Sequence, residues 1–406
     1  MTTANLFEAS VIGLAAACLT LPAAAAAAPA RALQDPTQPA LTLASRLRTA
    51  TTPATAPRPS GTVPPRYRYV SLAVPDSIYS FVGGLNDAGT AVGFYNSGGA
   101  SQPTYWDADG TLHTLGAPAG GASAMGINNA GEVFGIGSDD AGNIQLLRWN
   151  LDTPDAFEVL YSSSDTTVIP RAIGEDGTIV GYWGDTAATR VTGFVWTAAD
   201  GIVDYGCVDP AHPEYQCQFS AISASGRIVG AWSDPGDPTG AAHALVAQAG
   251  TPAVSDYSAQ TAAANSMINA INANDLAVGH MDIAGTGTLV PVTFAPDGTV
   301  TPLPAAASFG SGFSSAAGIN GSGTIIGYAQ DATNTLWVDE GGEVLDLLAA
   351  TDDPGSLTPS NTVAINAGGS IAAIGVSIVP FAIQSFVLVP IPPDAIFADG
   401  FDSASR

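Results

Sequence analysis

The chain of 406 residues is poor in the side chains that enzymes use for chemistry. It has no lysine, four histidines and three cysteines, and it contains no Gly-x-Ser-x-Gly elbow, His-Glu-x-x-His motif or phosphate-binding glycine loop. An active site needs converging reactive groups, and the supply of them is small here. We therefore assign no catalytic residue, no cofactor and no metal-ligand motif, and we favour a non-enzymatic protein over an enzyme.

Positive charge is equally scarce. The chain has 11 basic residues, all arginine, against 36 acidic residues, which gives a formal net charge of −25 at pH 7. Such a charge argues against nucleic acid and anionic lipid as partners. Acidic residues at exposed turns would keep an exported protein soluble. The alternative interpretation is that they bind a cationic ligand or calcium.

A long apolar stretch occurs only near the N-terminus. Residues 1–28 resemble a secretory signal peptide, with an apolar segment from Val11 to Leu21 and Ala-x-Ala cleavage choices before residue 29. The segment departs from the usual pattern because it has Glu8 and no basic residue before the apolar part. We predict a mature chain without a membrane span, extracellular or on the cell surface of a bacterium, with the periplasm as an alternative. A retained membrane anchor is the competing interpretation.

The segments before and after the central repeats differ from the repeats in composition. Residues 29–65 are rich in Ala, Thr and Pro and are typical of a flexible linker. Residues 66–392 hold the repeats described next. Residues 393–406 form a C-terminal tail, in which residues 396–401 resemble a short terminal signature of some secreted proteins of Gram-negative bacteria. A disordered or loosely docked tail is the alternative.

A ten-residue phrase recurs seven times and organises the chain. The copies are GLNDAGTAVG from Gly84, GINNAGEVFG from Gly126, AIGEDGTIVG from Ala172, AISASGRIVG from Ala221, AINANDLAVG from Ala270, GINGSGTIIG from Gly318 and AINAGGSIAA from Ala364. Successive copies are 42 to 49 residues apart. Asn/Asp-x-Gly in the middle is typical of a tight turn, and the β-branched ending is typical of a strand. Each repeat phrase therefore predicts a β-hairpin.

A second pair of strands is expected after most of the hairpins. It surrounds an aromatic residue, namely Trp106, Trp149, Trp196, Phe294, Trp337 or Phe386, whereas the fourth unit has no clear equivalent. Asp-Gly or Gly-Gly between the flanking strands marks a turn. Because the aromatic residues recur with the repeat, we expect them to form a core between neighbouring units.

Four strands in a unit of this length predict a blade of a β-propeller. We expect an all-β fold, a seven-bladed propeller of four-stranded antiparallel blades, with another repeated all-β array as the alternative. Residues 67–73 resemble the missing fourth strand of the last blade, whose own strands end near residues 385–389. We therefore predict that the N-terminal strand closes the ring beside residues 385–389.

The order of motifs within each repeat resembles that of a known family. A GINNAGxVVG-like phrase, then an aromatic strand of the His-Ala-Phe-x-Trp type, then a strand ending in Leu-Gly, is similar to the HAF repeat of bacterial extracellular proteins. The resemblance covers roughly residues 67–389, and the triplet from His243 to Leu245 comes closest to the name-giving motif. It implies secretion and a repeat fold, and it brings no catalytic residues.

Two cysteines remain after removal of the signal, Cys207 and Cys217. In an oxidising compartment they are expected to form a disulfide across a proline-containing connection. Zinc is the alternative, because His212 lies between them in the sequence, although a fourth ligand is not evident.

Two tryptophans fall outside the aromatic register, Trp183 and Trp232. Each follows the hairpin and precedes a loop, so we predict that they contact a ligand. Weaker candidates for calcium are the aspartates of two turns, Asp107, Asp109, Asp139 and Asp140, which place oxygen atoms close together in sequence. Turns rich in aspartate are also ordinary hairpin chemistry.

The function we expect is binding through loops on one face, with a polysaccharide or a protein of unknown identity as the partner. A propeller-type carbohydrate-active enzyme, either a lyase or a hydrolase, is one alternative. A structural component of the cell envelope is another. Fold-level analogy is a weak basis for choosing among them.

Overall fold

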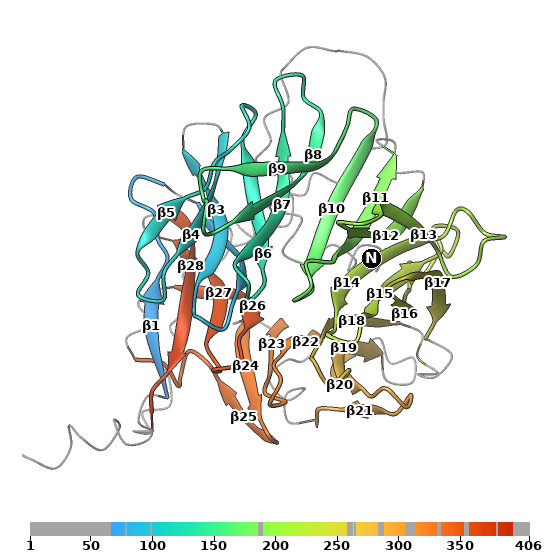
Figure 1. Cartoon of the computed structure of the whole chain (residues 1–406). Coiled ribbons are helices and arrows are strands. Elements are labelled where there is room, and N and C mark those ends of the chain that lie inside the picture. The colour runs from blue at the N-terminus through green and yellow to red at the C-terminus, as the bar shows by residue number, and fades with distance from the viewer. Residues whose placement is uncertain are drawn as a thin grey trace, which may run out of the picture.

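The computed structural model describes residues 66–392, apart from positions 78, 98–99, 186–189, 258–262, 264, 283–287, 305–312, 331–333, 353–356 and 379–380. The predicted signal, linker and tail lie outside the described residues. The named elements are β-strands, which Figure 1 shows arranged around a common centre. Among the described residues no helix is long and apolar enough to cross a membrane.

The strands follow the repeat in antiparallel groups of four, each numbered here by its repeat phrase. Group 1 contains β2 (Ser80–Leu85), β3 (Ala91–Ser97), β4 (Ala100–Trp106) and β5 (Leu112–Thr114). Group 2 contains β6 (Ala122–Ile127), β7 (Glu132–Ser138), β8 (Ile144–Asn150) and β9 (Phe157–Ser163). Group 3 contains β10 (Thr166–Ile173), β11 (Ile179–Asp185), β12 (Val191–Thr197) and β13 (Gly201–Gly206).

The second half of the chain continues in the same order. Group 4 contains β14 (Gln216–Ile222), β15 (Arg227–Ser233), β16 (Ala242–Gln248) and β17 (Thr251–Asp256). Group 5 contains β18 (Ser266–Ile271), β19 (Ala277–Asp282), β20 (Leu289–Phe294) and β21 (Val300–Pro302). Group 6 contains β22 (Phe313–Ile319), β23 (Ile325–Gln330), β24 (Thr335–Glu340) and β25 (Glu343–Asp346). One parallel pair, Leu289 with Phe313, joins groups 5 and 6 in a single eight-stranded sheet.

Group 7 is made from both ends of the described chain. It contains β26 (Thr358–Ile365), β27 (Ile371–Ile378) and β28 (Phe381–Pro390), and its fourth strand is β1 (Tyr67–Ser71). Arg68 pairs with Val389 and Ser71 with Phe386, antiparallel. In Figure 1 the blue β1 lies beside the red β28. The expected pairing of the N-terminal strand with residues 385–389 is therefore present.

Each repeat phrase forms the turn between the first two strands of its group. Gly89 has a φ of 83°, and Asp275, at the same place in the fifth phrase, has a φ of 61°. A positive φ is costly for most residues, and glycine tolerates it best, followed by asparagine and aspartate. In four of the phrases, the asparagine at the third place joins neighbouring groups. Asn128 Nδ2 donates to the Gly174 carbonyl, and Asn320 Nδ2 donates to the Asn366 carbonyl.

The first strand of every group contains a β-bulge just before the repeat phrase. The residue left out of the pairing is Gly83, Met125, Arg171, Ser220, Asn269, Ala317 or Val363. The bulge pushes a backbone carbonyl toward the second strand. A Cβ on Gly135 would lie 2.0 Å from the Ser123 carbonyl oxygen. The glycine that closes most phrases is therefore required by the bulge.

The seventh phrase closes on Ala373 instead of glycine. Its first strand, β26, has a second register shift, between Pro359 and Asn361, in addition to the shift between Thr362 and Ala364. The other first strands each show one shift. The extra irregularity accompanies the one copy in which a methyl group stands at the closing position.

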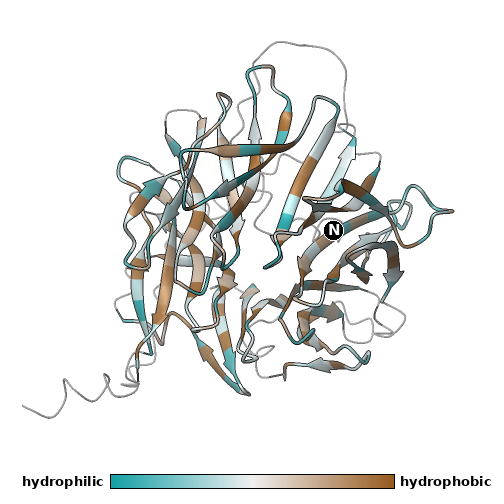
Figure 2. Ribbon diagram, viewed as in Figure 1, coloured by the Kyte–Doolittle hydropathy of each residue, from teal (hydrophilic) through white to brown (hydrophobic). Residues whose placement is uncertain are grey.

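The core lies between neighbouring groups, as expected from the aromatic residues. Trp106, Trp149 and Trp337 are at most 1% exposed, and Phe294 and Phe386 are also fully buried. Figure 2 shows hydrophobic segments along the strands and hydrophilic ones at many turns.

The strand register corrects one detail of the sequence interpretation. Trp106, Trp149 and Trp196 pair with the eighth residue of the repeat phrase, but Trp337 pairs with the tenth, Gly327. Phe386 is displaced in the same way, opposite Ala373. A displacement of two residues keeps the side chain on the same face of the sheet, so the ring stays in the core. In the fourth unit the aromatic position is occupied by Ala247.

Candidate functional site

Trp183 and Trp232 lie near the ends of the second strands of groups 3 and 4. Both strands run away from the turn of the repeat phrase, so the two tryptophans lie at the edge opposite those turns. The connection from β13 to β14 reaches the same edge, because Cys217 pairs with Trp232. Part of the loop after Trp183, residues 186–189, lies outside the described residues.

Trp183 is half-buried and packs between groups 2 and 3. Its Nε1 donates to Thr192 Oγ1 at 2.9 Å, and its ring meets the edge of Tyr161 on β9 with 5.8 Å between centroids. Only part of the ring therefore faces solvent. Contact of Trp183 with a ligand stays a prediction.

Trp232 belongs to a continuous stack of four rings, which we call the aromatic ladder: His212, Tyr215, Trp232 and His243. The successive ring centroids are 4.7, 5.0 and 4.6 Å apart. His212 is exposed, whereas the other three rings are half-buried. His243 is the cross-strand neighbour of Trp232 on β16, which brings the two rings together. The ladder thus runs from solvent into the surface of group 4.

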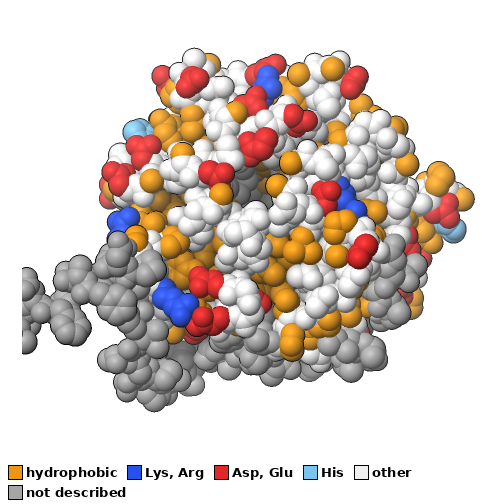
Figure 3. All heavy atoms as spheres, turned by 60° about the horizontal axis from the view of Figure 1, so that its bottom comes forward, with side chains coloured by type: hydrophobic (Ala, Val, Ile, Leu, Met, Phe, Trp, Pro, Cys, Tyr) orange, Lys and Arg blue, Asp and Glu red, His pale blue; other side chains and the backbone are white. Residues whose placement is uncertain are grey.

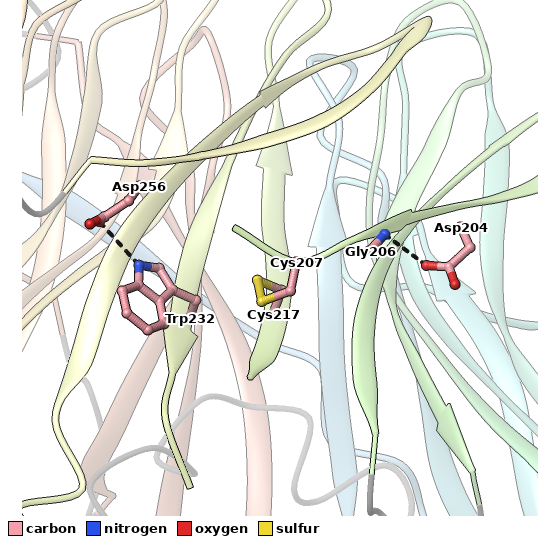
Figure 4. The surroundings of a disulfide bond; sticks show 6 residues. All are labelled: Asp204, Gly206, Cys207, Cys217, Trp232 and Asp256. Atoms are coloured by element: carbon pink, nitrogen blue, oxygen red, sulfur yellow. Dashed lines mark hydrogen bonds between the residues drawn. A yellow bond between two sulfur atoms is a disulfide. The ribbon is translucent and has the colours of Figure 1, made fainter. Parts of the chain in front are cut away.

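A disulfide fixes the chain that carries the outer half of the ladder. Cys207 and Cys217 are bonded, with 5.3 Å between their Cα atoms, as the sequence predicted. The bond closes the connection from β13 to β14, which holds His212 and Tyr215. Figure 4 shows the disulfide beside Trp232. With both sulfur atoms bonded to each other, the alternative of a zinc site at these cysteines does not apply.

Carboxylates surround the ladder. Trp232 Nε1 donates to Asp256 Oδ1 at 3.1 Å, which Figure 4 also shows. His212 Nδ1 lies 2.8 Å from Glu214 Oε1, and this hydrogen bond raises the pKa of His212. Burial, and then the charge of Asp234, raise the pKa of Tyr215. The site offers aromatic faces together with hydrogen-bond acceptors, the combination that suits a ligand with both C–H faces and hydroxyl groups.

The sequence identified Trp232 but missed its partners. His243 was recognised as a strand residue, and His212 as lying between the cysteines, yet nothing local indicated that they share one stack. The missing information was the strand register, which places Trp232 opposite both Cys217 and His243.

A central cavity of about 290 Å³ is the second place where side chains converge. The first strands of all groups line it, and each contributes its bulge residue. Sequence reasoning missed this set, although the signal is simple: it is the residue directly before each repeat phrase. Arg171 is the charged member of the set among the described residues.

A buried serine and histidine lie near this cavity. His280 Nδ1 is 2.9 Å from Ser315 Oγ, to which Asn269 Nδ2 also donates at 3.0 Å. Burial lowers the pKa of His280 to about 4, so its ring is neutral at pH 7. Ser315 is fully buried. A serine without exposure cannot attack a substrate, so we assign this pair to the packing of groups 5 and 6.

Three of the four aspartates considered for calcium are engaged within their own hairpins. Asp107 Oδ2 lies 2.8 Å from His113 Nε2, and Asp109 Oδ1 accepts the Thr111 amide. Asp139 Oδ1 accepts two backbone amides of its loop, and Asp140 is exposed beside it. In the part of the chain that the structure describes, no three His, Cys, Asp or Glu residues are grouped to hold a metal ion. Calcium binding stays a prediction.

Acidic side chains dominate the visible charge. Figure 3 shows many carboxylates and few basic groups on one face of the molecule. Several of the arginines are paired, for example Arg148 with Glu158 at 2.7 Å and Arg190 with Asp204 at 3.0 Å.

Comparison with known proteins gives likeness of fold alone. No family model matches the chain, and no curated protein does. An oligogalacturonate lyase in complex with manganese aligns with a TM-score of 0.51 and 11% identity, covering 82% of this chain and 98% of that one. A catalytically inactive virginiamycin B lyase from Staphylococcus aureus aligns with a TM-score of 0.49 and 14% identity, over 80% and 100% of the two chains.

TolB from Acinetobacter baumannii gives a weaker match, with a TM-score of 0.40 and 9% identity over 65% of this chain. The chain spans 63% of the length of that protein. Identities this low carry no information on activity or partners. With its repeated four-stranded antiparallel groups arranged around a common centre, the chain has a fold of the β-propeller kind, which agrees with the alignment to the oligogalacturonate lyase.

Proposed function

We propose that the protein is a secreted or cell-surface β-propeller without enzymatic activity, which binds a polysaccharide or a protein through loops on one face. The aromatic ladder carries this proposal, because it is a stack of rings at the edge opposite the repeat turns and is partly open to solvent. The proposal includes membership of the HAF-repeat proteins and a complete ring of seven blades. The hydrogen bond from Asn366 Nδ2 to the Asn86 carbonyl supports the ring.

Of the two partner classes, the ladder favours a polysaccharide. Sugar rings present C–H faces that pack on aromatic rings and hydroxyl groups that donate to carboxylates. Asp234, Glu214 and Asp256 surround the ladder, so an acidic polymer would be repelled and a neutral or basic one accepted. The disulfide supports an exported protein, because such bonds persist in oxidising compartments.

Affinity electrophoresis in gels that contain neutral, basic or acidic polysaccharides tests this function. We expect a neutral or basic polymer to retard the protein, and Trp232→Ala to weaken the apparent affinity about tenfold or more, as removal of a central tryptophan typically does. Trp183→Ala should have a smaller effect, since part of that ring is already packed against Tyr161.

Phe157→Ala provides the control, because Phe157 is an exposed aromatic residue on β9, away from the ladder. Its affinity should equal that of the unchanged protein. Retardation that persists in Trp232→Ala would place the polymer elsewhere. If no polymer retards the protein, the partner is a protein or the role is structural, and the polysaccharide proposal is wrong.

A further inference from the structure

Hydrogen bonds between the turns of the repeat phrases link six pairs of neighbouring groups. All seven phrases lie within the described residues. Asparagine side chains link groups 2 and 3, 5 and 6, 6 and 7, and 7 and 1, each donating to a backbone carbonyl of the neighbouring phrase. Asn129 Nδ2 donates to Asp87 Oδ2 between groups 1 and 2, and Ser225 Oγ donates to Asp275 Oδ1 between groups 4 and 5. These phrases are therefore joined at the edge where their turns lie.

Groups 3 and 4 lack such a link. The third residue of the third phrase is Gly174, which has no side chain to donate, and Ser223 in the fourth phrase bonds within its own turn. Among the described residues, no hydrogen bond joins these two phrases. Farther along the groups, the Gly250 amide donates to the Tyr205 hydroxyl, and an apolar cluster fills the space between them. At the edge of the turns, groups 3 and 4 thus depend on packing.

The disulfide lies at the opposite edge of this same pair of groups. Cys207 follows β13, the last strand of group 3, and Cys217 is on β14, the first strand of group 4. The connection between these strands, residues 207–215, is long, and its residues 210–214 are exposed. Groups 2 and 3, by contrast, are connected by residues 164–165 alone. The disulfide therefore joins the pair of groups whose repeat turns are not linked.

The disulfide also positions the outer half of the aromatic ladder. His212 and Tyr215 lie within the connection that it closes. The backbone hydrogen bonds described for residues 208–215 remain inside that segment, for example from the Tyr215 amide to the His212 carbonyl at 3.1 Å. Without the disulfide, ring stacking on Trp232 and the covalent ends of the segment would attach it to group 4. A change at the disulfide therefore changes the ladder.

We propose that the disulfide is a redox-sensitive latch between groups 3 and 4. While it is intact, the two groups stay joined at the edge opposite the turns and the ladder is complete. Reduction by a dithiol releases this junction, so groups 3 and 4 separate locally more often and the outer half of the ladder detaches from Trp232. The latch does not depend on the function proposed above, because it is measured without a ligand. If that function holds, reduction also weakens polysaccharide binding.

The reaction is an exchange between thiols and a disulfide. A thiolate of the dithiol attacks one sulfur of the protein disulfide, and attack at Cys207 is expected because Cys207 is half-buried whereas Cys217 is fully buried. A mixed disulfide forms, and Cys217 leaves as a thiolate and takes up a proton. The second thiol of the reagent then closes a disulfide within the reagent and releases Cys207 as a thiol. The protein disulfide is reduced by two electrons, which the dithiol supplies.

Hydrogen–deuterium exchange of the whole protein, measured with and without the dithiol dithiothreitol, tests the latch. Reduction should accelerate amide exchange about tenfold or more in residues 201–222, which include β13 and β14, because these amides open with their junction. Residues 157–173, which include β9 and β10, belong to the linked groups 2 and 3 and should be unaffected. Cys207→Ser combined with Cys217→Ser should exchange like the reduced protein and should not respond to the reagent.

Restoring the missing turn link provides the matched variant. Gly174→Asn gives the third phrase the asparagine that the second phrase has, placed to donate to the Ser223 carbonyl. It is combined with Asp176→Ala, because the new Cβ would lie 2.7 Å from Asp176 Oδ1. In the combined variant the acceleration by the dithiol should shrink about fivefold, as expected for one added hydrogen bond. Asp176→Ala alone is the control and should leave the acceleration unchanged.

The proposal is wrong if the dithiol fails to reduce the disulfide in the native protein, or if exchange after reduction rises equally in all groups or in none. It is also wrong if the combined variant keeps the full acceleration, because the missing turn link would then have no bearing on the junction. Should the combined variant fail to fold, the comparison of residues 201–222 with residues 157–173 decides. Polysaccharide binding by the oxidised protein is unaffected by any of these results, so the two proposals fail separately.

Discussion

Replacement of Asn366 by alanine tests the links between neighbouring groups of strands. Asn366 is 6% exposed, and its side chain makes two hydrogen bonds: Nδ2 donates to the Asn86 carbonyl at 3.0 Å, and Oδ1 accepts the Ser370 amide at 2.8 Å. Asn320 and Asn272 make the same pair of bonds at the same position of their repeat phrases. Asn366 differs because its link joins the last group to the first.

The expected cost follows from these two bonds. Each contributes about 1 kcal/mol, and leaving the Ser370 amide without its acceptor adds about as much again. Asn366→Ala should therefore lower the free energy of unfolding by about 2–3 kcal/mol. For a domain of this size that corresponds to a fall of about 3–4 °C in melting temperature. Equilibrium unfolding in guanidinium chloride, followed by tryptophan fluorescence and circular dichroism, measures it.

The chain itself supplies the control variant. Ser223 occupies the same place in the fourth phrase, and its Oγ accepts the Arg227 amide at 3.2 Å. Asn366→Ser should therefore keep the bond within the turn and lose the bond to the first group, at about half the cost. The reasoning is refuted if Asn366→Ala changes the free energy by less than about 0.5 kcal/mol, as an exposed substitution would. It is also refuted if serine costs as much as alanine.

Three further predictions concern other parts of the fold. Folding lowers the pKa of His280 from 6.5 to about 4, because the buried ring disfavours the charged form. The free energy of unfolding should therefore be constant above pH 6.5 and fall by about 3 kcal/mol as the pH decreases to 4. Unfolding curves recorded at several pH values measure this slope, which His280→Gln should remove. Gly135→Ala should lower the free energy of unfolding by more than about 2 kcal/mol in chemical unfolding, because the new Cβ would lie 2.0 Å from the Ser123 carbonyl oxygen. Ala373→Gly should lower it by less than about 1 kcal/mol. Equal losses would contradict the role given to the bulge. Replacing Cys207 and Cys217 by alanine should lower the free energy of unfolding by roughly 3 kcal/mol and increase the solvent exposure of Trp232, and an unchanged fluorescence maximum would separate the disulfide from the ladder.

The sequence was sufficient for the hairpins because each depends on local chemistry. Asn/Asp-x-Gly determines the turn within four residues, and a single repeat phrase therefore predicts its own strands. The pairing of β1 with β28 could also be predicted, because one unit lacked a strand and the other end of the chain had one to spare. The disulfide could be predicted because two cysteines remain after the expected signal, and a chain that is expected to be exported meets an oxidising compartment.

What the sequence could not provide was the register between strands. Trp337 was expected in register with the other tryptophans, and the strands displace it by two residues, because a pattern of aromatic residues does not show which partner each one faces. The ladder was missed for the same reason, since Tyr215, Trp232 and His243 come from three different segments. The cavity wall depends on bulges, which leave no local signal beyond the residue before each phrase.

The bulge has a consequence for how this fold can vary. At most positions in a β-sheet two requirements constrain the choice of residue: pairing with the next strand and packing against the next sheet. The bulge residue in each repeat is free of the first requirement and lines the cavity, so at most of these positions the side chain can change without breaking a strand pair. Gly83 is an exception, because a Cβ there would lie 2.8 Å from the Met125 backbone, and Asn269 would lose its hydrogen bond to Ser315. Seven such positions surround one space, each encoded by a single codon at a fixed place in the repeat. A new binding specificity is therefore accessible through single substitutions at these positions, while the strands that hold them stay as they are.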